Sequence, residues 1–211
     1  MIKAKSRIGI IGAGRLGTAV ARQALKAGYE VRIANSRGPE SLRLQLSVLL
    51  PGAIGASVED AIVSSDIILL AIPLNAYTNL PKDLFSGKIV IDAMNYWPPT
   101  EGILQEFEGG SSSEYIQQYL ADARVVKSLN HVAYNELEQH SLPSSAPDRR
   151  AVLVAGNDED AKRQVSQFVD AIGFEPVDLG LIATGKKFQP DTKLFNLRYN
   201  KQELKKLLDS N

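Results

Sequence analysis

Short apolar runs alternate along the chain with segments of helical spacing. The runs at 7–11, 29–34, 66–72, 88–92, 124–129 and 151–155 are rich in Ile, Val, Leu and Ala and predict β-strands, with shorter strands expected at 53–56 and 175–178. The run at 66–72 is almost uninterrupted, as in a central parallel strand that is buried on both faces. Strands that alternate with helices predict a doubly wound α/β fold with a parallel sheet.

Helices are predicted between these strands. Apolar side chains recur at spacings of three and four from Ala13 to Ala27. Gly28 can adopt the left-handed backbone conformation that commonly ends a helix. Ser111 and Glu114 have the spacing of a capping box, and acids from Asp158 onward favour another helix start. The predicted helices cover 13–27, 39–50, 58–64, 111–120, 158–172 and a final stretch that ends near 208.

The organisation predicts one main domain with a small appended part. We place a soft boundary near residue 121, with a dinucleotide-binding Rossmann domain at 1–121 and a small C-terminal α/β lobe at 122–211 packed on it. The segment Pro98–Ser113 is rich in Pro, Gly, Ser and Glu, and the sequence leaves open whether it is a mobile lid or a surface loop.

A glycine motif follows the first predicted strand. Gly12, Gly14 and Gly17 fit G-x-G-x-x-G between a strand and a helix, which is the context that gives this motif its meaning. The first glycine allows a sharp turn, the second lets main chain approach a pyrophosphate, and the third lets the helix pack closely on its strand. The helix N-terminus would then present free N–H groups to the phosphates. The motif therefore predicts a dinucleotide site.

The end of the second predicted strand indicates which dinucleotide is bound. NAD-preferring sites place Asp or Glu there, but this chain has Asn35, Ser36 and Arg37, with no carboxylate before Glu40. A guanidinium can bind a 2′-phosphate through charge-assisted hydrogen bonds, and a serine hydroxyl adds a donor. We therefore predict NADP rather than NAD as the cofactor.

The carboxyl ends of parallel strands share one edge of a sheet, and ligands bind there. The strand ends at Gly12, Ser36, Ile72 and Asn95 are therefore expected to meet in one crevice. Neighbouring positions that are predicted to contribute to the cofactor site or to a substrate pocket are Ala71, Pro73, Met94, Asn130 and His131.

Composition narrows the function classes. Lys+Arg and Asp+Glu number 24 each, so the formal net charge is zero, which argues against a nucleic-acid binder. The chain has no cysteine, which excludes disulfides, thiolate nucleophiles and Cys-based zinc sites, and we expect no metal. The first apolar run is too short for a secretory or membrane segment, so a cytoplasmic protein with no membrane contact is expected.

Acid–base residues are scarce in the predicted crevice. The two histidines, His131 and His140, have no obvious ligand partners, and His131 is equally compatible with a pocket or with a local hydrogen bond. Hydride transfer to a conjugated ring depends on alignment and exclusion of water more than on a protein acid. The sequence favours that reaction over ketone or imine reduction and identifies no catalytic residue.

Several motifs together resemble the family of F420-dependent NADP oxidoreductases, in its branch of small bacterial NADP-binding reductases. The resemblance covers nearly the whole chain and is carried by IGIIGAGRLG, ANSRGP, LLAIP, VVKSLN and AGNDEDAK. It implies NADP on Gly12, Gly14, Arg15, Leu16 and Gly17, with Ser36 and Arg37 at the 2′-phosphate. It further implies hydride transfer to coenzyme F420 or another flavin-like ring as the small-molecule acceptor, and a homodimer.

The sequence departs from this family at the loops that would face the acceptor, at 92–97 and at Asn130. The identity of the acceptor and the direction of transfer therefore stay open. Two alternatives remain at this point: an NADPH-dependent imine or ketoacid reductase, and a non-catalytic NADPH-binding sensor module.

Overall fold

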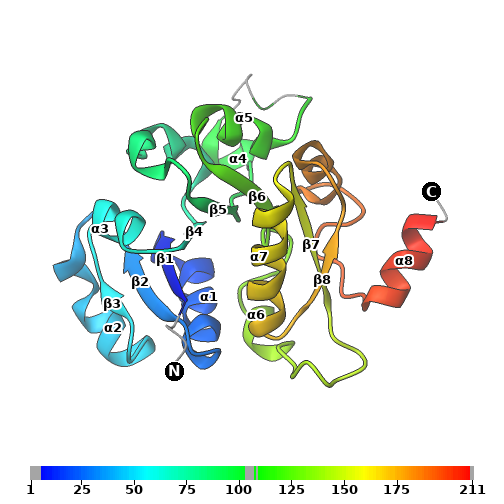
Figure 1. Ribbon diagram of the computed structural model, residues 1–211, viewed down its shortest axis with the longest axis horizontal. Coiled ribbons are helices and arrows are strands. Elements are labelled where there is room, and N and C mark those ends of the chain that lie inside the picture. The colour runs from blue at the N-terminus through cyan, green and yellow to red at the C-terminus, as the bar shows by residue number, and fades with distance from the viewer. Residues whose placement is uncertain (1–5, 103–106, 108, 210–211) are drawn as a thin grey trace.

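The computed structural model describes residues 6–102, 107 and 109–209 (Figure 1). Its strands are β1 (Arg7–Ile11), β2 (Glu30–Ala34), β3 (Ile54–Gly55), β4 (Ile67–Leu70), β5 (Ile89–Asp92), β6 (Arg124–Ser128), β7 (Ala151–Gly156) and β8 (Glu175–Asp178). Its α-helices are α1 (Arg15–Lys26), α2 (Arg43–Leu49), α3 (Val58–Val63), α4 (Pro98–Glu101), α5 (Ser112–Tyr119), α6 (Glu136–Gln139), α7 (Glu159–Ala171) and α8 (Lys201–Asp209). Four 3₁₀ segments also occur in this part of the chain: η1 (Pro39–Leu42), η2 (Leu74–Asn79), η3 (Lys82–Phe85) and η5 (Ile182–Phe188).

The eight strands of the described residues form one sheet in the order β3-β2-β1-β4-β5-β6-β7-β8. The strand order reverses beside β1, which is the switch point of doubly wound sheets, where ligands bind. The predicted α/β fold is therefore confirmed. The pairing of β6 with β7 is antiparallel, while the other pairings are parallel. β7 is buried along its whole length, as the central parallel strands are, so its apolar run did not reveal this reversal.

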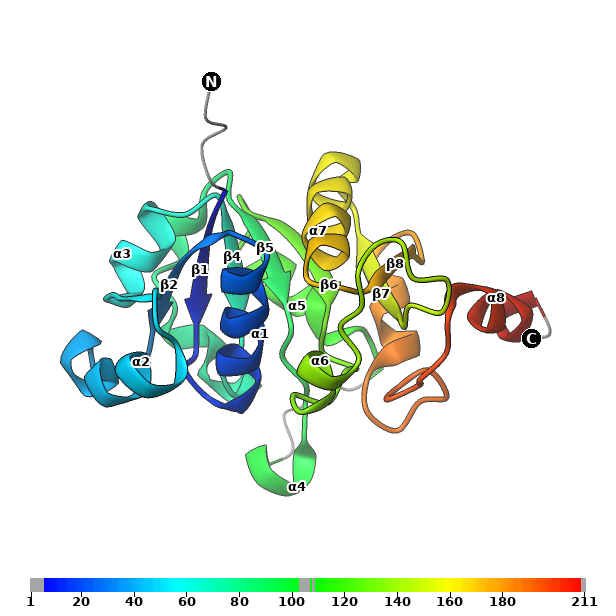
Figure 2. The ribbon, with the colours of Figure 1, turned by 90° about the horizontal axis from the view of Figure 1, so that it is seen from below.

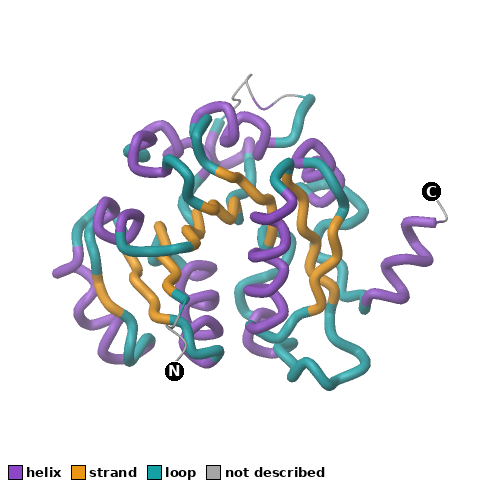
Figure 3. The backbone as a smooth tube through the Cα atoms, in the orientation of Figure 1, coloured by secondary structure: helices purple, strands orange, loops and turns teal. Residues whose placement is uncertain are grey.

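Helices cover both faces of the sheet (Figures 1 and 3). One face packs against α1 and α7 in a core that includes Val20, Leu69 and Phe168, and the other packs against α3 and α5 around Leu70 and Phe85. A third apolar cluster lies between β7, η5 and α8, where Leu204 of α8 is buried. In Figure 2, α8 extends from the β8 side of the sheet.

The strands beyond residue 121 join the same sheet as those before it, because β6 pairs with β5 in register. The structure thus shows the described residues from 122 to 209 as an extension of the first sheet with its own helices, and the boundary at residue 121 stays a prediction. Part of the segment Pro98–Ser113, for which the sequence left a lid and a surface loop open, lies outside the described residues, namely 103–106 and 108. The beginning of this segment forms the single turn of α4.

Several predicted helix ends are confirmed. Gly28 follows α1 with φ of +87°, a conformation that glycine adopts without a Cβ penalty. The Asp158 side chain accepts a hydrogen bond from the backbone N–H of Ala161 and so caps α7. Glu114 accepts from the N–H of Ser111 at 3.0 Å, as a capping box requires. No helix in the part of the chain that the structure describes is long and apolar enough to cross a bilayer.

Candidate functional site

The glycine turn after β1 has no room for side chains on its protein side. Gly12 has φ of +117°, and a Cβ there would lie 2.3 Å from the carbonyl oxygen of Ala71. A Cβ on Gly17 would lie 1.9 Å from the carbonyl oxygen of Gly12. Both glycines are therefore required by close backbone packing at the start of α1.

Gly14 differs from these two because a Cβ there would meet nothing within 4 Å. The space above it is open, and Gly14 is the N-cap of α1 with no side-chain cap and no acid in the first helical turn. The first N–H groups of α1 are thus presented to open space, and the positive end of the helix dipole lies there. This arrangement fits a pyrophosphate.

A cavity of about 670 Å³ opens beside the turn, between the ends of β1, β2 and β4. The structure brings many of the predicted cofactor residues to its lining: Gly12, Gly14, Asn35, Ser36, Arg37, Ala71, Ile72 and Pro73. Val58 and Glu59 of α3 also line this cavity, together with residues of the segment 76–81, and the sequence pattern did not indicate these. The volume is in the range of small-molecule sites.

The turn after β2 is held by its own side chains. The Asn35 Oδ1 atom accepts a hydrogen bond from the N–H of Arg37 at 2.9 Å, and the Asn35 amide donates to Ser41. Asn35 therefore shapes the turn. The exposed Arg37 guanidinium makes no hydrogen bond or ion pair with any residue that the structure describes, so it is available to an anion in the cavity.

A second cavity of about 550 Å³ adjoins the first at Ala71, Ile72 and Pro73. Apolar and polar groups both line it, and the apolar side chains include Leu16 from α1 and Met94 and Trp97 from the segment after β5. The polar residues that line it are Asn75, Asn95 and Glu101. The Leu16, Met94 and Asn95 side chains are thus placed where the sequence analysis expected a ligand.

Glu101 is the one carboxylate among the described residues that line this second cavity. Its two oxygens accept hydrogen bonds from the N–H groups of Asn75, at 3.1 Å, and of Trp97, at 2.9 Å. The carboxylate therefore joins the start of η2 to the start of α4.

Asn130 and His131 have different surroundings although they are neighbours in sequence. Asn130 is 4% exposed and exchanges two hydrogen bonds with Asn95. Asn130 Nδ2 donates to Asn95 Oδ1 at 3.0 Å, and Asn95 Nδ2 donates to the Asn130 backbone carbonyl at 2.8 Å. His131 is 1% exposed, and its Nε2 accepts from the N–H of Leu153 at 3.1 Å. Asn130 thus contacts Asn95, which lines the second cavity, but is not itself part of that lining, and His131 lies in the core.

Burial sets the charge state of His131. Desolvation, with the positive charges of Arg150 and Lys127 nearby, lowers the pKa of His131 to about 3. The imidazole is therefore neutral at physiological pH and serves as a hydrogen-bond acceptor inside the core. Its edge also contacts the Phe188 ring, with centroids 5.2 Å apart.

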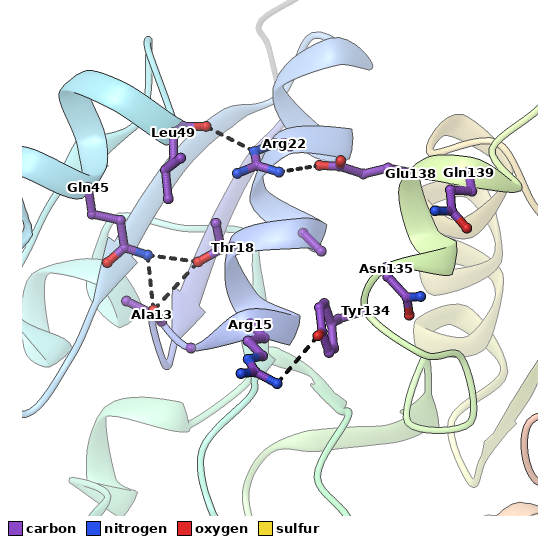
Figure 4. A pocket seen from close by; sticks show the side chains of 12 residues that line it. Ala13, Arg15, Thr18, Arg22, Gln45, Leu49, Tyr134, Asn135, Glu138 and Gln139 are labelled. Atoms are coloured by element: carbon purple, nitrogen blue, oxygen red, sulfur yellow. Dashed lines mark hydrogen bonds and ion pairs between the residues drawn. The ribbon is translucent and has the colours of Figure 1, made fainter.

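A third cavity of about 580 Å³ lies on the other side of the glycine turn, between α1, α2 and α6 (Figure 4). Arg15 points into it from α1 and donates to the Tyr134 hydroxyl at 3.4 Å, while Arg22 forms an ion pair with Glu138 at 2.7 Å. Gln45 reaches the turn from α2 and donates to the Ala13 carbonyl at 3.0 Å. The predicted cofactor residue Arg15 thus has its side chain in this third cavity.

Sequence reasoning also missed a buried ion pair behind the second cavity. Asp92 ends β5, Lys127 lies near the end of β6, and both side chains are 0% exposed. A lysine within the otherwise apolar run VVKSL could have indicated it, because a charge in a buried strand needs a partner.

Comparison with known proteins agrees with this geometry. Residues 7–96 match the family model described as NADP oxidoreductase, coenzyme F420-dependent. The solved structure of a hypothetical protein from Sinorhizobium meliloti is 30% identical, with a TM-score of 0.81 over 93% of this chain and 96% of that one. The chain belongs to this family of NADP oxidoreductases. The recognition made from the motifs is therefore confirmed.

Two further comparisons are informative. The structure of a candidate F420-dependent NADP reductase from Arthrobacter sp. FB24 is 24% identical, with a TM-score of 0.74 over 87% of this chain and 88% of that one, and it shares the fold. Metalloreductase STEAP3 of Rattus norvegicus is 28% identical over 191 residues, which are 89% of this chain and 36% of that protein. The chain spans about a third of the length of the curated metalloreductases that it matches.

Proposed function

We propose that the protein binds NADP(H) across the glycine turn and transfers a hydride between it and a planar redox ring of the deazaflavin or flavin class, such as coenzyme F420. The observation that carries this proposal is the second cavity, which adjoins the dinucleotide cavity and is lined by Leu16, Met94 and Trp97. Its described carboxylate, Glu101, is already bound to two backbone N–H groups. The membership of the chain in the F420-dependent family supports the same reaction class.

The residues present fit the dinucleotide. The open space above Gly14 and the free N–H groups of α1 suit the two phosphates, and the unpaired Arg37 with Ser36 suits a 2′-phosphate in the first cavity. Glu59 also lines that cavity, but this carboxylate comes from α3, whereas the carboxylate that binds the ribose in NAD sites comes from the end of the second strand. NADP is therefore the proposed cofactor.

When it is bound, NADPH supplies two electrons and a proton as a hydride. The chain contributes the wall that aligns the two rings and excludes water: Leu16 comes from the first turn of α1, Ile72 follows β4, and Met94 and Trp97 follow β5. The exposed Trp97 ring offers a planar surface beside this cavity. A ring acceptor can take its second proton from water, so the residues that line the cavity need not supply one.

An anaerobic assay tests the proposal. NADPH oxidation is followed by its absorbance with coenzyme F420, FMN and riboflavin as acceptors, beside cyclic imines and ketoacids. We expect turnover with at least one of the ring acceptors and faster turnover with NADPH than with NADH. Turnover with imines or ketoacids alone would favour the reductase alternative, and tight NADPH binding without any turnover would favour the sensor.

The proposed oligomer is a homodimer, which rests on the resemblance to the family. Light scattering coupled to size-exclusion chromatography measures the mass of the protein in solution. A mass equal to that of one 23.0 kDa chain would contradict the dimer.

A further inference from the structure

The buried ion pair behind the second cavity holds the backbone of Met94 from both sides. Asp92 and Lys127 are partners in the register of β5 and β6, and Lys127 Nζ lies 3.3 Å from Asp92 Oδ2. Lys127 Nζ also donates to the carbonyl oxygen of Met94 at 2.7 Å, while Asp92 Oδ1 accepts from the N–H of Met94 at 3.0 Å. Both polar groups of the Met94 main chain are thus fixed by one ion pair.

A second contact fixes the next residue. Asn95 exchanges hydrogen bonds with Asn130, whose amide also donates to the carbonyl oxygen of Phe188 at 2.9 Å. Leu129, which precedes Asn130, has φ of +65°, in the left-handed region that a branched side chain rarely adopts. The strained residue turns the chain after β6 so that Asn130 faces the end of β5.

Stability alone does not account for such a pair. Removing two charges from water is costly, and an apolar pair of similar volume often stabilises a core as well or better. Burial lowers the pKa of Lys127, which shows that desolvation outweighs the attraction of Asp92 at that amine. What the ion pair provides and an apolar pair cannot is directional bonding to the Met94 N–H and carbonyl.

We propose that Lys127 and Asp92 are positioning residues, which fix the segment Ala93–Trp97 so that Met94, Asn95 and Trp97 form a rigid wall of the second cavity. The acceptor ring would be held against this wall, at the spacing that hydride transfer requires. The proposal rests on the proposed function for its effect on turnover, but the rigidity of the segment can be measured without turnover.

The competing explanation is that the pair serves only to seat α5. Lys127 Nζ also lies 3.3 Å from Ser112 Oγ, and the Ser113 hydroxyl donates to Asp92, so the start of α5 is attached to the same ion pair. A purely structural role would lower stability without changing the segment after β5 in the folded protein. The experiment therefore needs a measurement on that segment.

Trp97 provides this measurement, because it is the only tryptophan in the chain and closes the segment. The test compares the wild type with Lys127→Met and with the double variant Lys127→Met/Asp92→Leu. The double variant removes both charges of the pair and so leaves no unpaired charge. Arg150→Met is the matched control, since Arg150 and Glu136 form another buried ion pair, at 2.6 Å with side chains 4% and 6% exposed, that contacts none of the segment. Acrylamide quenching of Trp97 emission, the affinity for 2′-phospho-AMP and kcat with the ring acceptor are measured on each.

We expect quenching of Trp97 to increase at least twofold and kcat to fall at least tenfold in both Lys127 variants. The affinity for 2′-phospho-AMP should stay within threefold of wild type, because that probe occupies the first cavity only. The control should match wild type in quenching and in kcat.

The proposal is overturned if the double variant is folded and matches wild type in quenching and kcat, or if neither Lys127 variant folds, since the role would then be one of stability. A wild-type protein without turnover on any ring acceptor would defeat the proposed function. The quenching of Trp97 would still decide whether the ion pair fixes the segment.

Discussion

The Gln45 side chain of α2 donates a hydrogen bond to the carbonyl oxygen of Ala13, 3.0 Å away, and so anchors the glycine turn from outside the motif. The same amide donates to the Thr18 hydroxyl at 2.7 Å, which ties the turn to α1 (Figure 4). A turn whose carbonyl is fixed keeps its N–H groups aimed at the cofactor phosphates. The motif that recognises phosphate is thus completed by a residue that no glycine spacing reveals.

Gln45→Ala should weaken NADPH binding without unfolding the protein. A single hydrogen bond contributes about 0.5–1.5 kcal/mol, so the loss corresponds to an increase in Kd of about 3- to 10-fold. Isothermal titration calorimetry measures the affinity, and thermal unfolding confirms the fold. Gln139→Ala is the matched control, because Gln139 lines the same third cavity and has no hydrogen bond to the turn. Equal affinities of the two variants would contradict the role of Gln45.

Two of the motif glycines, Gly17 and Gly14, should respond differently to alanine. Gly17→Ala places a Cβ 1.9 Å from a backbone oxygen, and we expect a loss of about 3 kcal/mol in the free energy of unfolding, at the upper end of overpacking costs. Gly14→Ala meets nothing within 4 Å and has an ordinary φ of −76°, so stability should be unchanged or slightly higher. Its methyl group would instead occupy the space proposed for the pyrophosphate.

Urea unfolding and NADPH titration of the two variants separate these effects. Gly14→Ala should raise the Kd for NADPH about tenfold, since 1.4 kcal/mol of steric cost is a factor of ten in affinity. If Gly14→Ala binds NADPH as tightly as wild type, the phosphates do not lie over this turn.

Arg37→Ala should remove the preference for NADPH over NADH. A hydrogen bond to a charged group contributes about 1.5–3 kcal/mol, which predicts a rise in the Kd for NADPH of about 10- to 100-fold, with NADH affinity unchanged. Arg43→Ala is the control, because Arg43 is an exposed arginine at the start of α2, 3.7 Å from Glu40 and outside the lining of the first cavity. Titrations of each variant with NADPH and with NADH at constant ionic strength measure the two affinities. An equal loss of affinity for both cofactors would contradict the role of Arg37 at the 2′-phosphate.

The sequence predicted the elements that depend on local rules and missed the contacts between distant residues. The strand, turn and helix around Gly12 follow from backbone sterics, and the end of α1 before Gly28 follows from its positive φ. The roles of Gln45 and Lys127 could not be predicted in the same way, because their partners lie on other elements. Ala13 lies 32 positions from Gln45, and Asp92 lies 35 positions from Lys127. Their roles depend on the packing of α2 and on the register of β5 and β6.

His131 should make the protein less stable in acid. Its pKa is about 3 when folded and 6.5 when unfolded, so between these values the unfolded state binds more protons and stability falls as the pH falls. From pH 7 to pH 5 this amounts to about 2 kcal/mol at about 1.4 kcal/mol per pH unit below 6.5. In His131→Gln, whose amide oxygen can still accept from the N–H of Leu153, the acid-induced loss should be smaller by that amount. Urea unfolding of both proteins at the two pH values measures it, and parallel losses would show that His131 is protonated in the folded state.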